Sequence, residues 1–183
     1  MNEEQYRKIR LHSEKQNKLV KDCLRQALLQ LIGKKEYKAI TVTEICKKAG
    51  VSRTAFYTNF GSIDAILSDA MKAFHEEMMQ RAGSPFRTDT TREWYKKFFS
   101  FIEEKEHIIR IFFKAEFQTE YLNWLNKTVL HDENASAAKK YSRLIWSGAM
   151  VNVVSYWLRT DKKEPIDDIT NYCFNNLPKI YTI

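Results

Sequence analysis

The most specific polar side chains of this sequence fall on one short predicted helix. With Phe56 turned inward, a helical wheel places Thr54 and Thr58 on the outward side. Arg53 and Asn59 fall at the two edges of the same face. Hydroxyl groups bind phosphates and base edges, and a guanidinium pairs with guanine through two hydrogen bonds. We therefore expect a face that fits the major groove of DNA, which is about 12 Å wide.

A capped helix and a tight turn come directly before this segment. Thr41 and Glu44 have the spacing of a capping box, in which each side chain accepts from the other residue's backbone N–H. The apolar positions of this second helix share one face: Val42, Ile45, Cys46 and Ala49. Gly50 suits a left-handed helix end, and Ser52 suits the cap of the next helix. The pattern predicts a helix-turn-helix unit, with an ordinary helical hairpin as the alternative.

The positive charge of the chain is concentrated in its N-terminal third. The 183 residues carry a formal net charge of +7. Residues 1–60 hold 13 basic residues (Lys and Arg) and six acidic ones (Asp and Glu). The rest of the chain holds 17 basic and 17 acidic residues, so its net charge is zero. This distribution indicates a polyanionic partner that meets only the N-terminal third. The alternative is a solvated basic surface without a partner.

The residues from Ile40 to Phe60 resemble the signature of the TetR family of transcriptional regulators. The matching positions are Ile40, Thr41, Val42, Ile45, Ala49, Gly50, Val51, Ser52, Phe56, Tyr57 and Phe60. The resemblance implies a homodimer on a palindromic operator in double-stranded DNA, released when a small molecule enters the C-terminal domain. The segment Tyr156–Arg159, followed by Pro165, resembles the end of a C-terminal domain found in firmicute members.

In that family, the start of the second helix and the exposed face of the third contact DNA. The resemblance implies this role here for Thr41, Thr43, Ser52, Arg53, Thr54, Ala55, Tyr57, Thr58 and Asn59. Two positions depart from the family pattern, since Ile63 replaces a phosphate-binding lysine and Ala55 replaces a Thr or Gly. The basic pairs Lys34-Lys35 and Lys47-Lys48 offer compensating contacts, although lysines on a solvated face are the commoner case.

Few helix breakers and long 3.6-residue periodicities predict an all-α protein of about nine helices. We expect residues 1–12 to form a frayed or disordered basic arm. Residues 13–61 would form the helix-turn-helix DNA-binding domain, and residues 62–183 a larger helical domain for effector binding and dimerisation. The first helix is expected from Ser13 to Lys34.

Two features are expected to organise the aromatic region that follows the loop at residues 83–88. A second capping box, Thr90-x-x-Glu93, would open the next helix. A break near Lys105–His107 would then divide the region up to Asn126 into two helices.

Aromatic residues crowd the stretch from Trp94 to Trp157 and allow two interpretations. Most of them suit a helical core, and some would line a pocket for a small apolar or aromatic effector. The pocket candidates are Phe98, Phe113, Phe117, Tyr121, Trp146 and Met150. The last two helices, about 137–159 and 165–179, are the predicted dimer seam, which would build a four-helix bundle with a second copy.

The sequence offers little support for catalysis or for a metal or cofactor. None of the four histidines has a ligand-spaced partner, and the three cysteines suit neither a zinc site nor a disulfide framework. There is no Gly-rich phosphate loop, and His107 among Glu103, Glu104 and Glu106 suits a surface helix junction. We expect a regulator rather than an enzyme, with no metal and no cofactor.

The sequence contains no apolar run long enough for a membrane span, and its polar N-terminus lacks a signal-peptide core. A cytoplasmic protein is therefore expected. A basic protein lying on a membrane surface is an alternative, as is a regulator of this fold that needs no effector. The operator, the regulated gene, the effector and the choice between repression and activation stay open.

Overall fold

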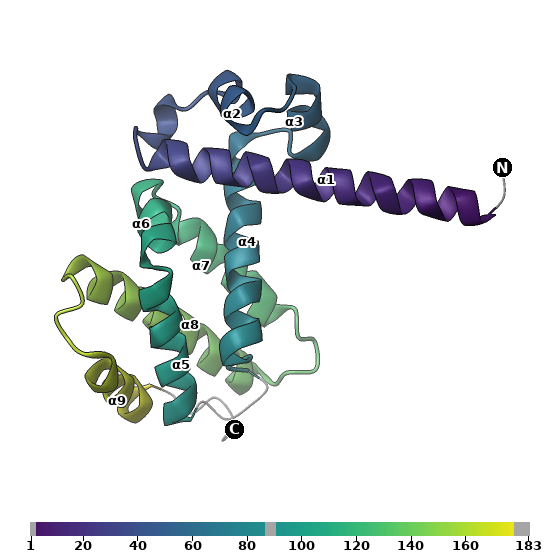
Figure 1. Cartoon of the computed structure of the whole chain (residues 1–183). Helices are drawn as coiled ribbons and strands as arrows, with labels where there is room; N and C mark the ends of the chain where they lie inside the picture. The colour runs from purple at the N-terminus through teal and green to yellow at the C-terminus, as the bar shows by residue number, and fades with distance from the viewer. Residues whose placement is uncertain (1–2, 87–90, 178–183) are drawn as a thin grey trace. The chain divides into compact units, whose positions relative to one another are not determined.

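The computed structural model describes residues 3–86 and 91–177, and these two ranges are helical apart from their loops (Figure 1). The elements are α1 (Glu3–Ile32), the 3₁₀ helix η1 (Tyr37–Ala39), α2 (Val42–Ala49), α3 (Arg53–Asn59), α4 (Ile63–Ala82), α5 (Arg92–Glu104), α6 (Glu106–Lys114), α7 (Gln118–Leu130), α8 (Ala137–Arg159) and α9 (Ile166–Asn176). The described residues thus hold nine α-helices and no strand, which confirms the predicted all-α class.

Helix α1 is longer than the sequence analysis predicts. It begins at Glu3, so the predicted start at Ser13 is wrong, and the basic arm expected over residues 1–12 continues the helix from Glu3 on. Neither Gly nor Pro interrupts this stretch, and Arg10 pairs with Glu14 one turn later at 2.9 Å. From Gln5 to Leu19 every side chain that the structure describes is exposed. We call residues 5–19 the α1 arm.

The chain forms two compact units, Met1–Ala73 and Phe74–Ile183. In the first unit α1 packs against both α2 and α3. Three side chains, Leu28 of α1, Ile45 of α2 and Phe56 of α3, are fully buried. Because each helix gives its apolar face to the same small core, the outer faces of α2 and α3 are left to solvent.

Two polar contacts tie the first part of α4 to the other elements of the first unit. Arg25 of α1 donates from Nη1 to Oδ2 of Asp69 at 2.9 Å. The Tyr37 hydroxyl of η1 donates to Oδ1 of Asp64. Burial, together with the Asp64 carboxylate, raises the pKa of Tyr37 well above its usual value. The phenol therefore stays protonated and keeps its hydrogen bond to α4.

The second unit has a core rich in aromatic rings. Helix α5 packs on α9, and α7 packs on α8. The largest fully buried side chains here are Trp157, Tyr95 and Phe99. The indole N–H of Trp146 donates to the Tyr95 hydroxyl at 2.9 Å, so this polar pair is satisfied inside the core.

The helix boundaries of the second unit differ from expectation at two places. The cap of α5 is Thr91, whose Oγ1 accepts from the backbone N–H of Trp94 at 3.1 Å, so the predicted box with Thr90 is wrong for this helix start. Thr90 itself lies outside the described residues. The expected break after Glu104 is present, and a second break follows Lys114, where Glu116 adopts a φ of 56°. The region therefore holds three helices rather than two.

Helix α4 runs unbroken from Ile63 to Ala82, and the division between the two units falls inside it, after Ala73. The domain boundary expected from the sequence lies between residues 61 and 62, before this helix. The first part of α4 buries Ile66 and Leu67, and its later part gives Met78 to the aromatic core of the second unit. One helix thus serves both units.

In the described parts of the chain, no helix combines the length and the apolar character that crossing a bilayer requires.

Candidate nucleic-acid interface

The predicted capping box at the start of α2 is present. Thr41 Oγ1 accepts from the Glu44 backbone N–H at 3.3 Å, and Glu44 Oε2 accepts from the Thr41 backbone N–H at 2.9 Å. Lys35 adds an ion pair to the same carboxylate at 2.8 Å. The hydrogen bonds from Lys35 and Thr41 lower the pKa of Glu44 to about 2. The start of α2 is therefore fixed by an ion pair as well as by the two hydrogen bonds of the capping box.

The turn between α2 and α3 adopts the predicted backbone geometry. Gly50 has a φ of 68° and ψ of 29°, in the left-handed region, and its N–H donates to the Cys46 carbonyl. The Val51 N–H also reaches the Cys46 carbonyl, at 3.1 Å. Ser52 then caps α3, since its Oγ accepts from the Ala55 backbone N–H at 3.1 Å. These bonds satisfy the ends of both helices, so the turn holds α3 against α2.

The two sides of α3 differ sharply in burial. Phe56 is fully buried, whereas the adjacent Tyr57 is 52% exposed, with the two rings edge to face at 5.1 Å. Thr54 and Thr58 are exposed on the outward side, and Arg53 is exposed at its edge. One face of α3 is therefore anchored in the core, and the opposite face presents a guanidinium and three hydroxyl groups to solvent.

Four of the predicted contact residues have side chains that are less available to a DNA partner than those on the outward face of α3. Thr41 and Ser52 are exposed, but their hydroxyls already serve as helix caps. Asn59 is half-buried, and its Nδ2 donates to the Ala55 carbonyl at 2.8 Å, while Ala55 itself is half-buried. Thr43 is exposed near the start of α2. The caps made by Thr41 and Ser52 agree with the sequence-based prediction, whereas no sequence signal indicates the bond from Asn59 to Ala55.

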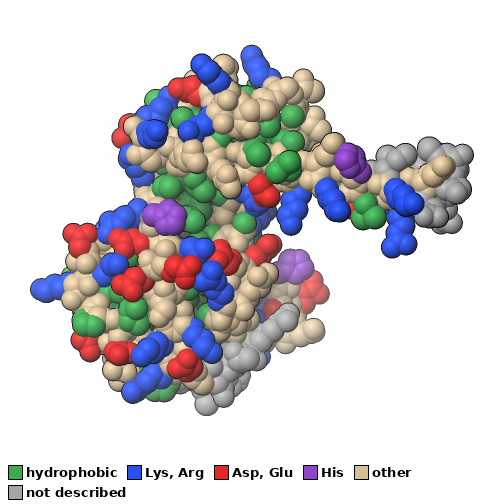
Figure 2. Space-filling model, in the orientation of Figure 1, with side chains coloured by type: hydrophobic (Ala, Val, Ile, Leu, Met, Phe, Trp, Pro, Cys, Tyr) green, Lys and Arg blue, Asp and Glu red, His purple; other side chains and the backbone are tan. Residues whose placement is uncertain are grey.

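The basic pairs near the interface also differ from one another. Lys35 is used internally by Glu44, so it is held within the first unit. Lys34, Lys47 and Lys48 are exposed. In Figure 2, Lys and Arg side chains are spread over the visible surface of the first unit and along the α1 arm. The surface around α2 and α3 is thus suited to a negatively charged partner.

Comparison with known proteins supports the same interpretation. Residues 24–70 match the family of bacterial regulatory proteins, tetR family. Residues 24–70 are a TetR-family domain. The match runs from the core-facing part of α1 through α2 and α3 into α4. The resemblance carried by Ile40–Phe60 is therefore confirmed.

Two solved structures share the TetR-type fold over most of the chain. A TetR transcriptional regulator from Streptococcus agalactiae has a TM-score of 0.60 at 16% identity, covering 90% of this chain and 97% of that one. The fatty acid degradation regulator FadR from Bacillus halodurans has a TM-score of 0.53 at 18% identity, covering 90% and 96%. No curated protein sequence matches the chain. The fold of the described residues is therefore TetR-like.

The six residues predicted for an effector pocket do not share one environment. Phe98, Trp146 and Met150 are buried in the core cluster of the second unit, and Phe113 packs against its edge. Phe117 is buried, and Tyr121, which is half-buried, lies outside that cluster. The Tyr121 hydroxyl is 3.1 Å from Nδ1 of His75.

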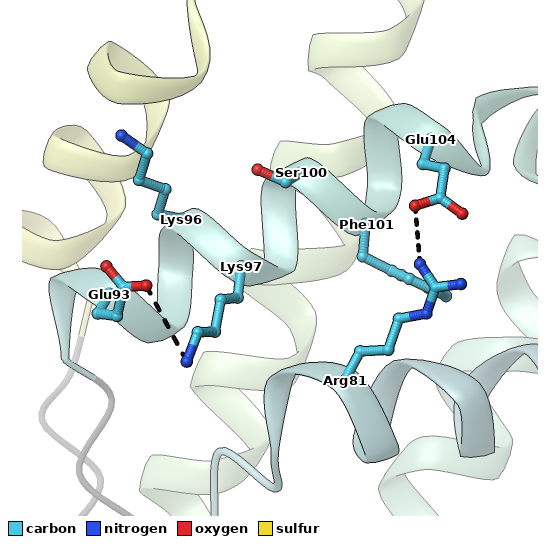
Figure 3. Close-up of a pocket in the computed structure, with 7 residues that line it drawn as sticks. All are labelled: Arg81, Glu93, Lys96, Lys97, Ser100, Phe101 and Glu104. Atoms are coloured by element: carbon cyan, nitrogen blue, oxygen red, sulfur yellow. Dashed lines mark hydrogen bonds and ion pairs between the residues drawn. The ribbon is translucent and has the colours of Figure 1, made fainter.

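One groove of the second unit lies beside α5 (Figure 3). Its volume is about 470 Å³, and it is lined by Arg81, Glu93, Lys96, Lys97, Ser100, Phe101 and Glu104. Arg81 donates to Glu104 at 2.7 Å, and Lys97 lies 4.0 Å from Glu93. This open groove is lined by paired charges and by none of the predicted pocket residues.

Among the residues that the structure describes, no three His, Cys, Asp or Glu side chains gather as a metal site would require.

Proposed function

We propose that this protein is a sequence-specific transcriptional regulator that binds a palindromic operator as a homodimer. The exposed face of α3 carries the proposal, because Arg53, Thr54, Tyr57 and Thr58 project from a helix whose opposite side is anchored by Phe56. Such a face enters a major groove and reads base edges, while nearby lysines bind phosphates. Residues 1–60, which lie within the first unit, also carry the whole positive excess of the chain.

The surface of α8 and α9 supports the dimer. Tyr141, Ile145 and Tyr156 are at least 60% exposed and share one face of α8. Gly148 lies between them on that face, and nothing lies within 4 Å of the position where a Cβ would stand. Tyr172 adds a 61% exposed ring on α9. Large apolar side chains around a small residue suit close packing against a second helix.

The proposed regulation is repression that a small molecule relieves. Two α3 helices must stand about 34–36 Å apart, or a matched larger span, to meet successive major grooves. An apolar or aromatic effector bound near Phe98, Phe113, Phe117, Tyr121, Trp146 and Met150 would shift the second unit. Because α4 is shared by both units, such a shift would change the separation of the α3 helices.

A second candidate is a regulator of the same fold that responds to no small molecule. It is favoured by the packing of Phe98 and Trp146, which both contact the Trp94 ring. A screen for thermal stabilisation separates the two candidates. A compound that both stabilises the protein and weakens operator binding supports the effector, and the absence of any such compound supports the second candidate.

DNA recognition is tested with an operator selected from random duplexes and with Kd values from fluorescence anisotropy. Arg53→Ala should weaken operator binding by roughly tenfold to a hundredfold, since a lost bidentate base contact costs about 1–3 kcal/mol. Tyr57→Phe, which keeps the ring, should weaken it less. Lys163→Ala, an exposed lysine of the second unit, is the matched control and should not change Kd. Equal affinity of the Arg53 variant and the parent protein would count against the proposal.

A further inference from the structure

The α1 arm is an exposed helix that no other described element covers. Its side chains from Gln5 to Leu19 are exposed wherever the structure describes them, and burial in α1 begins only at Val20. An isolated helix of about 12–15 residues is marginal in water, because most helical stability in proteins comes from packing. The arm is thus a surface whose order a partner would reinforce.

The charge of the arm indicates what kind of partner fits. Residues 5–21 hold six Lys and Arg and a single acidic residue, Glu14, which Arg10 pairs with. Arg7, Lys15 and Lys18 are exposed, and their spacing puts them on one side of the helix. From Arg7 to Lys18 this row extends about 16 Å at the α-helical rise of about 1.5 Å per residue. A linear polyanion matches a linear row of cations.

The arm begins beside the recognition helix of the same unit. Nζ of Lys21 lies 5.6 Å from the ring centre of Phe60, the C-cap residue of α3. From Lys21 to Gln5 the helix extends about 24 Å. That length corresponds to roughly seven base pairs, since each base pair rises about 3.4 Å along the duplex. The helix that carries the basic row therefore passes the C-terminal end of α3.

We propose that the α1 arm is a second DNA-binding element, which contacts phosphates flanking the operator. This inference rests on the proposed function, because it assumes that α3 binds the operator itself. The arm binds flanking DNA irrespective of its sequence, since lysine and arginine contacts to phosphate carry no base information. It therefore lengthens the DNA footprint and strengthens the salt dependence of binding.

The spacing of apolar residues disfavours an anionic membrane as the partner. Tyr6, Ile9, Leu11 and Leu19 are separated by three, two and eight positions, so they form no continuous apolar stripe along the arm. A helix that lies in a membrane interface needs such a stripe opposite its basic face. DNA, which needs only the cations, is the better match.

The test compares two duplexes, one trimmed to the selected operator and one extended by about eight base pairs at each end. The parent protein should bind the long duplex more tightly. The triple variant Arg7→Gln, Lys15→Gln and Lys18→Gln should lose this advantage, and its slope of log K against log salt should fall by about 0.9 per lost phosphate contact. A matched triple variant of exposed lysines in the second unit, Lys114→Gln, Lys127→Gln and Lys163→Gln, should keep both properties.

The outcomes separate this inference from the proposed function. If the arm variant keeps the length advantage and the full salt slope while Arg53→Ala still weakens operator binding, the arm inference alone fails. If the parent protein shows no sequence preference, the proposed function fails, and both triple variants are then compared on random duplexes. Binding to anionic phospholipid vesicles that depends on the three arm cations, without an effect on DNA, would also overturn the inference. Circular dichroism checks that the variant keeps its helix content.

Discussion

Asp69 of α4 accepts a hydrogen bond from Arg25 of α1 at 2.9 Å, with both side chains about a quarter to a third exposed. The same guanidinium also pairs with Asp22, so Arg25 lies between two carboxylates from two helices. Because Asp69 stands on α4 and Arg25 on the helix that supports α2 and α3, this ion pair holds α4 in register with the helix-turn-helix unit.

Asp69→Asn should therefore destabilise the first unit. The amide keeps the shape of the side chain but loses the charge, and a partly exposed charged hydrogen bond of this kind contributes roughly 1 kcal/mol to the free energy of unfolding. Urea unfolding followed by circular dichroism measures the change. Glu76→Gln, at an exposed position of the same helix, is the control, and an equal loss in both variants would show that the ion pair contributes nothing specific.

Gly50→Ala should lower stability and weaken DNA binding together. At a φ of 68° an alanine Cβ is strained by about 1 kcal/mol, although no other atom lies within 4 Å of it. Gly33→Ala is the matched control, because its backbone does not lie in the left-handed region and its Cβ would meet other atoms at 3.6 Å or more. Thermal melting and operator titration of both variants give the comparison. A Gly50 variant as stable as the Gly33 variant would refute the assigned turn geometry.

Acidification should destabilise the protein through His75. Burial lowers the pKa of His75 to about 4, whereas the same side chain in the unfolded chain titrates near 6.5. Between these values the unfolded state binds a proton that the folded state does not, so the free energy of unfolding falls as pH drops from about 6.5 to 4. The loss at the lower limit is roughly 3 kcal/mol.

Urea unfolding at several pH values between 5 and 7 measures this loss before most carboxylates titrate. His75→Phe should remove the pH slope in that range, because phenylalanine binds no proton. His131→Gln, at an exposed histidine, should leave the slope unchanged. A persistent slope in the His75 variant would assign the pH dependence to other groups.

Ile145→Asp should shift the proposed dimer towards monomers. This side chain is 60% exposed on α8, between the rings of Tyr141 and Tyr156, where a second copy would bury it. An unpaired carboxylate in such an interface opposes association. Light scattering across a concentration series should show a dimer for the parent protein and a monomer for the variant, with Lys163→Asp as the charged surface control. A parent protein that stays monomeric at micromolar concentration would contradict the proposed dimer interface of α8 and α9.

The helix-turn-helix region could be predicted in detail because its local signals agree. The capping residues Thr41 and Ser52, the left-handed Gly50 and the buried Phe56 each depend on interactions within a few residues. Such short-range chemistry can be inferred from spacing alone. The face of α3 therefore followed directly from the order of its residues.

Other features depend on partners that are distant in the chain. Lys35 binds Glu44, and Tyr121 meets His75 across 46 positions, and no periodicity indicates either pair. No sequence signal marks the break at Glu116 either, since it contains neither Gly nor Pro and has a positive φ that non-glycine residues adopt rarely. The start of α1 at Glu3 cannot be predicted from periodicity, because the polar N-terminal part of this helix has no apolar stripe.

The unbroken course of α4 has an evolutionary consequence. Recombination usually exchanges protein modules at loops, and proteases usually cut at them. Here the division between the two units falls within a hydrogen-bonded helix, from Ile63 to Ala82. The two units are therefore not separated by a loop at which they could be exchanged or cut. A second unit with different properties is therefore more readily obtained by gradual substitution of the existing one than by transplanting a foreign domain.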